Sequence, residues 1–597
     1  MSIKSCYKFF YKYQIILLIA LLLGCYFRTS NLDGKIFWVD EVSTAVRVSG
    51  YTVPQVNNAL SQQGIVDFND LLIYQTVTAD KTFINSWNAF TKSPEHAPLY
   101  FVLTRVWTQI WGSSITAIRS LAVVFSLLVF PALYWLCQEL FNRVFISKMA
   151  VILMSVSPFF VAYAQEARPY SLWTVTILLM SASLIRAIRI NCKQSWLLYS
   201  LCLTLGLYTS LFSIYVALFQ LIYLLATPVK NKLKAIKNYL ISSLLSLLAF
   251  SPWIFIIISQ LDLLQKNTSW MRGNFNLAEI IAVFIGTVLL VFGDLPISQD
   301  SDPVQIVIAL IVILFALSGL LILSRRGNKK LFRFALLFII SSSIFIFTHY
   351  IYLDLISIVG ALVALIILSL SGYSLYYLIT NTSRDCWLYI VCLMLSLPVP
   401  LLVADIINQG QSSTAPRYLI PLQLGIQIAV AYTLGNKIIA SEFKFWRGIV
   451  IVFLTIGIFS CVRNLNLSPF YQKGRNINNP AIAAIIDRSK SLVIAESNNT
   501  MDILSLAYSL SNQTKYKIID DQEDVTKYIN TTNVFIIKPS IELQQTLQQN
   551  PKIHFYKVYQ SHLFSADEIP LDLWRLKAKS VENPRRRKAQ GNARQDS

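Results

Sequence analysis

Residues 14–41, QIILLIALLLGCYFRTSNLDGKIFWVDE, join an apolar run to an acidic pair, and the organisation of the chain follows from this junction. The run 14–27 has no charged residue and predicts a first membrane span. Three lysines lie within the first twelve residues, so the positive-inside rule places the N-terminus in the cytoplasm. No clear cleavage site follows, which favours an uncleaved signal-anchor. Asp40 and Glu41 are therefore expected to emerge on the outer face.

The whole composition agrees with a membrane protein. Of 597 residues, 55% are hydrophobic and only 14% are charged, below the about 25% of a soluble domain. The formal charge of +20 comes mostly from short loops and the tail, where the positive-inside rule places Lys and Arg in a protein surrounded by membrane lipids. We therefore predict no nucleic-acid partner. The eight cysteines form no CxxC pair, which argues against a zinc site or a disulfide framework.

The hydropathy pattern predicts a polytopic α-helical protein of the plasma (inner) membrane with about thirteen crossings. Two apolar stretches are not counted as crossings: 99–111 is interpreted as an interfacial helix, and 279–292 as re-entrant or interfacial. The long run 196–226 is divided near Ser210 into a hairpin. The predicted crossings are 14–27, 116–137, 149–163, 170–185, the two halves of 196–226, 239–258, 304–323, 332–347, 355–379, 386–403, 418–434 and 445–461.

After Cys461 the composition changes to that of a small α/β domain. Short apolar strands at 492–495, 516–519, 534–537 and 553–559 alternate with helix-like segments at 500–511, 522–529 and 541–549, which predicts a mostly parallel sheet. The predicted organisation is a membrane domain 1–463 with a first outer loop 28–98, an extracytoplasmic α/β domain 464–580 and a basic, disordered tail 581–597.

Carboxylates gather on the predicted outer side, where an intramembrane or interfacial charge is a candidate for function. Asp40 or Glu41 could accept a proton from a hydroxyl nucleophile as a general base; the simpler interpretation makes Asp40 the N-cap of a helix. Glu166 lies at the outer end of the third crossing beside Arg168. The alternative there is an interfacial ion pair of little energetic value.

Three basic residues of the same side could hold an anionic head group. His96 could bind a phosphate or cap the interfacial helix. Arg417 could bind phosphate oxygens through its guanidinium or extend to the membrane surface. Arg119, just inside the second crossing, is expected to pair with an acid or a phosphate because burying it alone is costly.

Four segments of the chain together resemble a known family. They are FWVDE at 37–41, EHAPLYFVL at 95–103, WGSSITAIRSLAVVFSLL at 111–128 and SPFFVAYAQEARPYSL at 157–172. In order and spacing, they are similar to the C-type glycosyltransferase superfamily, in particular bacterial members of the protein O-mannosyltransferase and aminoarabinose transferase group of glycosyltransferase family 39. The resemblance runs from the first span to about Arg417. Ala97 departs from the family pattern by replacing the first of two prolines.

The resemblance implies a sugar donor carried on a polyprenyl phosphate and an acidic residue in the first outer loop that is essential for catalysis. That role would fall to Asp40, with Glu41 as the alternative, and the second acid would be Glu166, where many relatives have Asp. His96 and Arg417 would contact the lipid phosphate.

Together these residues predict a glycosyltransferase that inverts the anomeric centre, with Asp40 as base and His96, Arg417 or Arg119 stabilising the leaving phosphate. No residue spacing demands a metal, although a divalent cation is compatible with the chemistry. The acceptor is left open among a lipid, a glycan and a protein. Two alternatives are a lipid-linked sugar transporter or flippase, for which no repeated halves are visible, and a non-catalytic membrane scaffold.

Overall fold

The computed structural model describes residues 3–294, 355–439, 443–467, 475–488, 490–520, 523–529, 533–561 and 571–579. The chain divides into two compact units. The membrane unit comprises Met1–Leu32, Phe90–Trp111 and Ile115–Leu467, and the sheet unit comprises Asp33–Ala89, Gly112–Ser114 and Ser468–Ser597.

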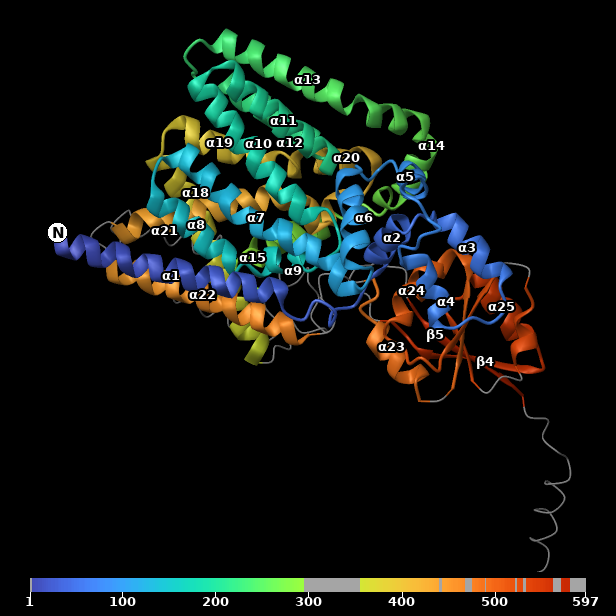
Figure 1. Ribbon diagram of the computed structural model, residues 1–597. Coiled ribbons are helices and arrows are strands. Elements are labelled where there is room, and N and C mark those ends of the chain that lie inside the picture. The colour runs from blue at the N-terminus through green and yellow to red at the C-terminus, as the bar shows by residue number, and fades with distance from the viewer. Residues whose placement is uncertain are drawn as a thin grey trace, which may run out of the picture. The chain divides into compact units, whose positions relative to one another are not determined.

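The membrane unit is helical, and α11 and α13 lie side by side in it (Figure 1). Seven of its described helices are long and apolar enough to cross a membrane, and a bent pair makes an eighth. Its helices are α1 (Ile3–Thr29), α6 (Leu99–Trp111), α7 (Ile115–Phe141), α8 (Val144–Ser155), α9 (Pro158–Ala164), α10 (Tyr170–Ile190), α11 (Lys193–Thr209), α12 (Ser213–Ala226), α13 (Lys232–Ser259), α14 (Leu261–Asn267), η2 (Ser269–Met271), α15 (Leu277–Leu290), α18 (Leu355–Asn381), α19 (Arg384–Leu395), α20 (Pro398–Asn408), η3 (Ser412–Thr414), η4 (Pro416–Leu419), α21 (Ile420–Ile439) and α22 (Phe443–Asn466).

Several predicted boundaries are found in this unit. The chain breaks between α11 and α12 at the expected Ser210, and the interfacial stretch forms the 13-residue helix α6. The third predicted crossing is not one straight helix, because α8 and α9 meet at an angle of 63°. Pro158 at the start of α9 explains the break, since proline lacks the amide that would continue the helix. The predicted crossings 304–323 and 332–347 lie outside the described residues.

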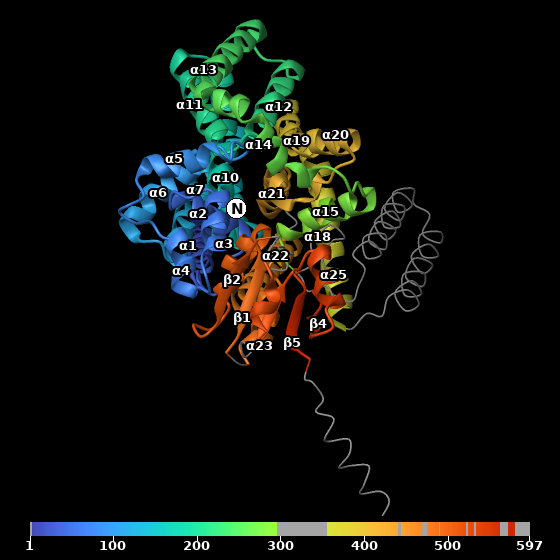
Figure 2. The same ribbon diagram turned by 90° about the vertical axis from the view of Figure 1, so that its right-hand side faces the viewer.

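The sheet unit contains a five-stranded sheet in the order β2-β1-β3-β5-β4, and Figure 2 shows β2, β1, β5 and β4 in this sequence. β1 pairs in parallel with β2 and β3, whereas β5 pairs antiparallel with β3 and β4. The expectation of a mostly parallel sheet is thus wrong: β5, absent from the prediction, enters between β3 and β4 and makes the sheet mixed. The strands are β1 (Leu492–Glu496), β2 (Lys515–Ile519), β3 (Val534–Ile537), β4 (Ile553–Tyr559) and β5 (Leu573–Ala578).

The first outer loop belongs to the sheet unit as well. Val66 and Tyr516 form an isolated β-bridge, and Lys517 donates from Nζ to the carbonyls of Ser61 and Gln63 at 3.0 and 2.7 Å. The loop and the C-terminal residues therefore share one folded body. The helices of this unit are α2 (Val39–Val48), α3 (Val53–Gln62), α4 (Phe68–Leu72), η1 (Ile73–Gln75), α5 (Phe83–Thr91), α23 (Asn479–Ile486), η5 (Ser497–Asn499), α24 (Thr500–Ala507), η6 (Val525–Tyr528) and α25 (Ile541–Gln549).

Apolar side chains of the strands form a hydrophobic core of the sheet unit. Ile494, Ile536 and Leu576, from three neighbouring strands, are buried in one core with Leu547 of α25. The predicted fold class, a polytopic α-helical membrane protein with a small C-terminal α/β domain, is confirmed. The number of crossings and the extracytoplasmic location of the domain stay predictions, and the tail 581–597 lies outside the described residues.

Candidate functional site

Glu166 is buried in the turn that follows α9. Its neighbour Gln165 donates from Nε2 to the carbonyls of Phe27 and Ser30, both at 2.8 Å. The amide of Arg168 donates to the carbonyl of Glu166 at 2.7 Å. The end of α1 thus fixes the turn that carries both predicted charges, and Glu166 and Arg168 are brought together.

Arg119 points back toward the same end of α1. Its side chain is buried in α7, and Nη1 donates to the carbonyl of Leu32 at 2.5 Å. A carbonyl shortly after α1 is therefore one partner of this cation. The acid or phosphate that the sequence predicts as its partner stays a prediction.

His96 lies in the turn before α6. Its Nε2 is 3.7 Å from Oε1 of Glu95, and its ring is tilted against Phe101 at 5.6 Å between centroids. The Glu95 carboxylate also accepts from Nδ2 of Asn267 in α14, at 3.1 Å to each oxygen. Glu95 therefore connects the turn of His96 to α14.

Arg417 lies in η4, directly after a turn held by a buried carboxylate. Asp405 of α20 accepts from the amide and hydroxyl of Ser412 at 2.7 and 2.6 Å, and from those of Ser413 at 2.7 and 2.5 Å. Asp405 is an acid within an otherwise apolar run, and this could have indicated its role from the sequence. The Arg417 guanidinium stacks 5.3 Å from the ring centroid of Tyr418.

Two links join these separate turns within the membrane unit. Tyr163 lies within electrostatic range of both Glu166 and Arg417, whose charges act on it in opposite directions. The segment α14–η2 contacts Glu95 through Asn267, and its Met271 carbonyl accepts from the amide of Gln411 at 3.1 Å. The turns that carry His96, Glu166 and Arg417 are thereby connected, although they are far apart in the sequence.

Asp40 and Glu41 lie in the first turn of α2, in the sheet unit. The helix begins two residues earlier than the capping interpretation requires: its N-cap is Trp38, which makes no side-chain cap. Two acids in the first turn suit the partial positive charge of a helix N-terminus. Glu41 is buried, whereas Asp40 is half-buried.

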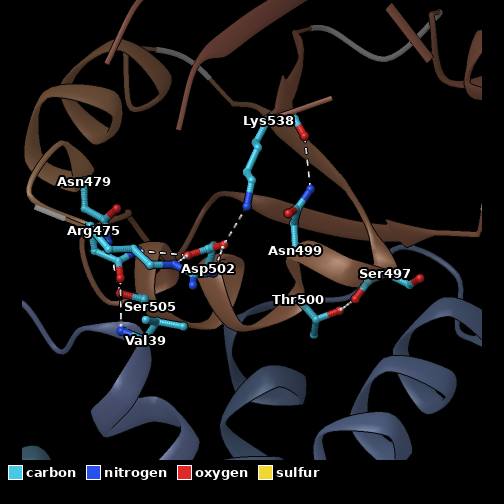
Figure 3. Close-up of polar contacts among 10 residues, drawn as sticks. Val39, Arg475, Asn479, Ser497, Asn499, Thr500, Asp502, Ser505 and Lys538 are labelled. Carbon is cyan, nitrogen blue, oxygen red and sulfur yellow. Dashed lines mark hydrogen bonds and ion pairs between the residues drawn. The ribbon is translucent and has the colours of Figure 1, made fainter. Parts of the chain in front are cut away.

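An ionic cluster that contains none of the predicted site residues lies next to α2 (Figure 3). Arg475 binds the buried carboxylate of Asp502 through Nε and Nη2 at 3.0 and 2.8 Å, and Nζ of Lys538 is 3.6 Å from the same carboxylate. Asp40 interacts electrostatically with Arg475. No motif indicates this cluster, because its members come from three segments that only the fold brings together.

The cluster favours the ionised form of Asp502. Burial alone would raise the pKa of Asp502, but Arg475 and Lys538 hold that pKa below its ordinary value. Burial lowers the pKa of Lys538, and Asp502 opposes this only in part. Within the part of the chain that the structure describes, no group of three or more His, Cys, Asp or Glu residues is suited to a metal ion.

In the comparisons with known proteins, one family model matches part of the chain. Residues 95–256 match the family model described as dolichyl-phosphate-mannose-protein mannosyltransferase. The comparison with curated proteins gave no match.

Three solved structures are similar to the chain. ArnT from Cupriavidus metallidurans in the apo state is 10% identical with a TM-score of 0.40, over 95% of this chain and 98% of that chain. ArnT bound to undecaprenyl phosphate is 12% identical with a TM-score of 0.39 over the same shares. The archaeal oligosaccharyltransferase AglB from Archaeoglobus fulgidus, in complex with an inhibitory peptide and a dolichol-phosphate, is 10% identical with a TM-score of 0.44, over 88% of this chain and 69% of that chain.

The matched segment includes His96, Arg119, Glu166 and Arg168. Over residues 95–256, the family match therefore confirms the resemblance to the C-type glycosyltransferase superfamily that the sequence motifs indicate.

Proposed function

We propose that the protein is a membrane glycosyltransferase that moves a sugar from a polyprenyl-phosphate donor to an acceptor hydroxyl on the outer face of the plasma membrane. The family match over residues 95–256 carries the proposal, because four of the seven predicted site residues lie inside it. The connected turns of His96, Glu166 and Arg417 support it, since they gather cations and a carboxylate in one unit.

In this reaction the bond between the anomeric carbon and the phosphate oxygen breaks, and the acceptor oxygen forms a new bond to that carbon. His96, Arg417 and Arg119 would stabilise the negative charge that develops on the leaving phosphate. The guanidinium of Arg168 would add a further positive charge near Glu166.

Asp40 would take the proton of the acceptor hydroxyl as this oxygen attacks from the face opposite the phosphate, with inversion of the anomeric centre. Glu41 is the neighbouring alternative, but its burial makes it the less accessible of the two acids. Glu166 would orient one of the reactants as the second acid of the site.

The experiment compares Asp40→Asn with the wild-type protein in proteoliposomes containing a polyprenyl-phosphate sugar and membrane extract as acceptor. We expect Asp40→Asn to lower the release of polyprenyl phosphate by about 10²- to 10⁴-fold, the usual contribution of a general base. Asp80→Asn is the matched control, because it removes the same charge from an exposed position of the same loop.

Two results would contradict the proposal. Full activity of Asp40→Asn would remove Asp40 from the mechanism. Movement of the lipid-linked sugar across the vesicle membrane by the wild-type protein, without sugar transfer, would instead favour a flippase.

A further inference from the structure

The sheet unit has its topological switch point beside β1. In the strand order, the chain leaves β1 for β2 on one side, and then crosses to β3 on the other side. Open parallel sheets bind their ligands in the crevice at the carboxyl ends of such strands. Here these ends are marked by Glu496 on β1 and by Lys538, directly after β3.

The first outer loop occupies this place. Helix α2 packs against α24, and α3 packs against η5, the turn that directly follows β1. Figure 3 shows the loop helices beneath Ser497, Thr500 and Asp502. A segment of the chain itself thus covers the crevice where a ligand would bind in other sheets of this kind.

Two hydrogen bonds fix the start of α2. The hydroxyl of Ser505 donates to the carbonyl of Phe37 at 2.7 Å, and the amide of Val39 donates to Oδ1 of Asn476 at 3.0 Å. Both partners therefore act on the backbone just before Asp40, and they determine where the helix begins.

Asp502 connects this anchor to the cations. It accepts from Nδ2 of Asn476 at 3.3 Å and from Arg475 in a bidentate pair. Lys538 approaches the same carboxylate, and its own backbone is in the left-handed conformation, with a φ of +46°, which a residue with a side chain rarely adopts. The Lys538 carbonyl is held in turn by Nδ2 of Asn499 at 3.0 Å.

We propose that the C-terminal sheet positions the Asp40 helix for catalysis, with Arg475 and Asp502 as positioning residues. Asp502 holds Arg475 and Asn476, and Asn476 holds the first amide of α2. Arg475 and Asp40 carry opposite charges within electrostatic range of each other. The inference rests on the proposed function for its catalytic meaning, but the mechanical link can be tested without any sugar transfer.

The first experiment measures hydrogen exchange of the α2 amides, residues 39–48, in the full-length protein in detergent. We expect Asp502→Asn to speed this exchange about tenfold, because the anchor at Asn476 is loosened. Lys557→Gln is the matched control, since it breaks the Lys557–Asp572 pair of the same unit without touching α2. If Asp502→Asn does not fold, Asn476→Ala tests the same link and leaves the Arg475–Asp502 pair intact.

The second experiment measures transfer kinetics of Arg475→Gln and Arg475→Lys. We expect Arg475→Gln to lower kcat about 10- to 100-fold with the donor KM unchanged. The acid limb of its pH profile should move to higher pH, because loss of a nearby cation disfavours an ionised carboxylate. Arg475→Lys should restore much of kcat and return the acid limb.

The outcomes separate the two proposals. Unchanged α2 exchange in both Asp502→Asn and Asn476→Ala, or an equal loss of kcat in Lys557→Gln, would overturn the positioning role. Absence of transfer by the wild-type protein would overturn the proposed function, and the exchange result would still decide whether the sheet holds α2.

Discussion

The buried carboxylate of Asp502 connects several separate segments of the sheet unit. It is 1% exposed, and its partners Arg475 and Asn476 come from the segment before α23, whereas Lys538 directly follows β3. Breaking a buried ion pair usually costs about 3–5 kcal/mol, because the remaining charge is left uncompensated. The Arg475 side chain is 43% exposed and can be rehydrated, so we expect a smaller loss, about 1–3 kcal/mol, for Asp502→Asn.

The pKa of Asp502 predicts a sensitivity to acid. Because this pKa lies below its ordinary value of 3.8 in the folded protein, the carboxylate stabilises the fold fully above about pH 4 and progressively less as the pH falls through the folded pKa. Thermal unfolding of the full-length protein between pH 2 and pH 7 should therefore show a steeper loss of stability in the wild-type protein than in Asp502→Asn. Asp520→Asn, an exposed acid of the same unit, should behave as the wild-type protein; an identical acid response in Asp502→Asn would contradict the assignment.

For single residues, local sequence patterns indicate which side chains are candidates for the proposed chemistry, but they do not indicate which partners these side chains contact. Asp40, His96 and Arg417 could be chosen because each lies in a short polar segment beside an apolar run. Arg475 and Asp502 could not, because 27 residues separate them and only the folding of α23 and α24 brings them together. Arg119 was expected to need a partner, and the carbonyl of Leu32 could not be foreseen, because any carbonyl can accept such a bond.

Among the elements, the break between α8 and α9 positions the turn of Glu166. Glycines in α22 and α1 let these two helices approach the break between α8 and α9 closely. A Cβ added to Gly457 of α22 would meet the Val156 carbonyl at 2.6 Å, and one added to Gly24 of α1 would meet Ser155 at 3.0 Å. Backbone atoms cannot move aside as a flexible side chain can, so these positions require glycine for packing.

We therefore expect Gly457→Ala to destabilise the membrane unit by about 1–3 kcal/mol, the usual cost of overpacking, and to lower transfer by displacing α9. Gly448→Ala is the control on the same helix, because its Cβ would meet nothing within 4 Å. Thermal unfolding in detergent and transfer assays would measure both effects. Equal stability of the two variants would show that α22 does not need its close approach to Val156.

The predicted elements differ in accuracy for physical reasons. Ile541–Gln549 was predicted with its observed bounds, because Ser540 caps its N-terminus and a turn follows it. Within 523–529, the described part of the predicted helical segment 522–529, the chain forms only the four-residue η6. Strand β5 was missed because Arg575 and Lys577 interrupt its apolar residues, and its pairing with β3 and β4 determines its conformation more than its own composition does.

For the whole molecule, the sheet unit constrains the topology. Residues 33–89 and the C-terminal residues form one folded body, as the Val66–Tyr516 bridge and the Lys515–Asp67 ion pair illustrate. They must therefore lie on the same side of the membrane, and the chain between them must cross an even number of times. Together with the predicted first span 14–27 this gives an odd total, as in the predicted thirteen crossings.

Labelling of single cysteines would test this topology together with the predicted orientation. In a chain with its natural cysteines replaced, Gln62→Cys in the first outer loop and Gln548→Cys in α25 should both react with a membrane-impermeant maleimide in intact cells, because both positions are exposed. Lys234→Cys, in the basic segment that the positive-inside rule places in the cytoplasm, should react only after permeabilisation. Labelling of Gln62→Cys and Gln548→Cys from opposite sides would contradict the shared unit. The reverse pattern at all three positions would keep the unit intact but place it in the cytoplasm, where Asp40 could not act on the outer face.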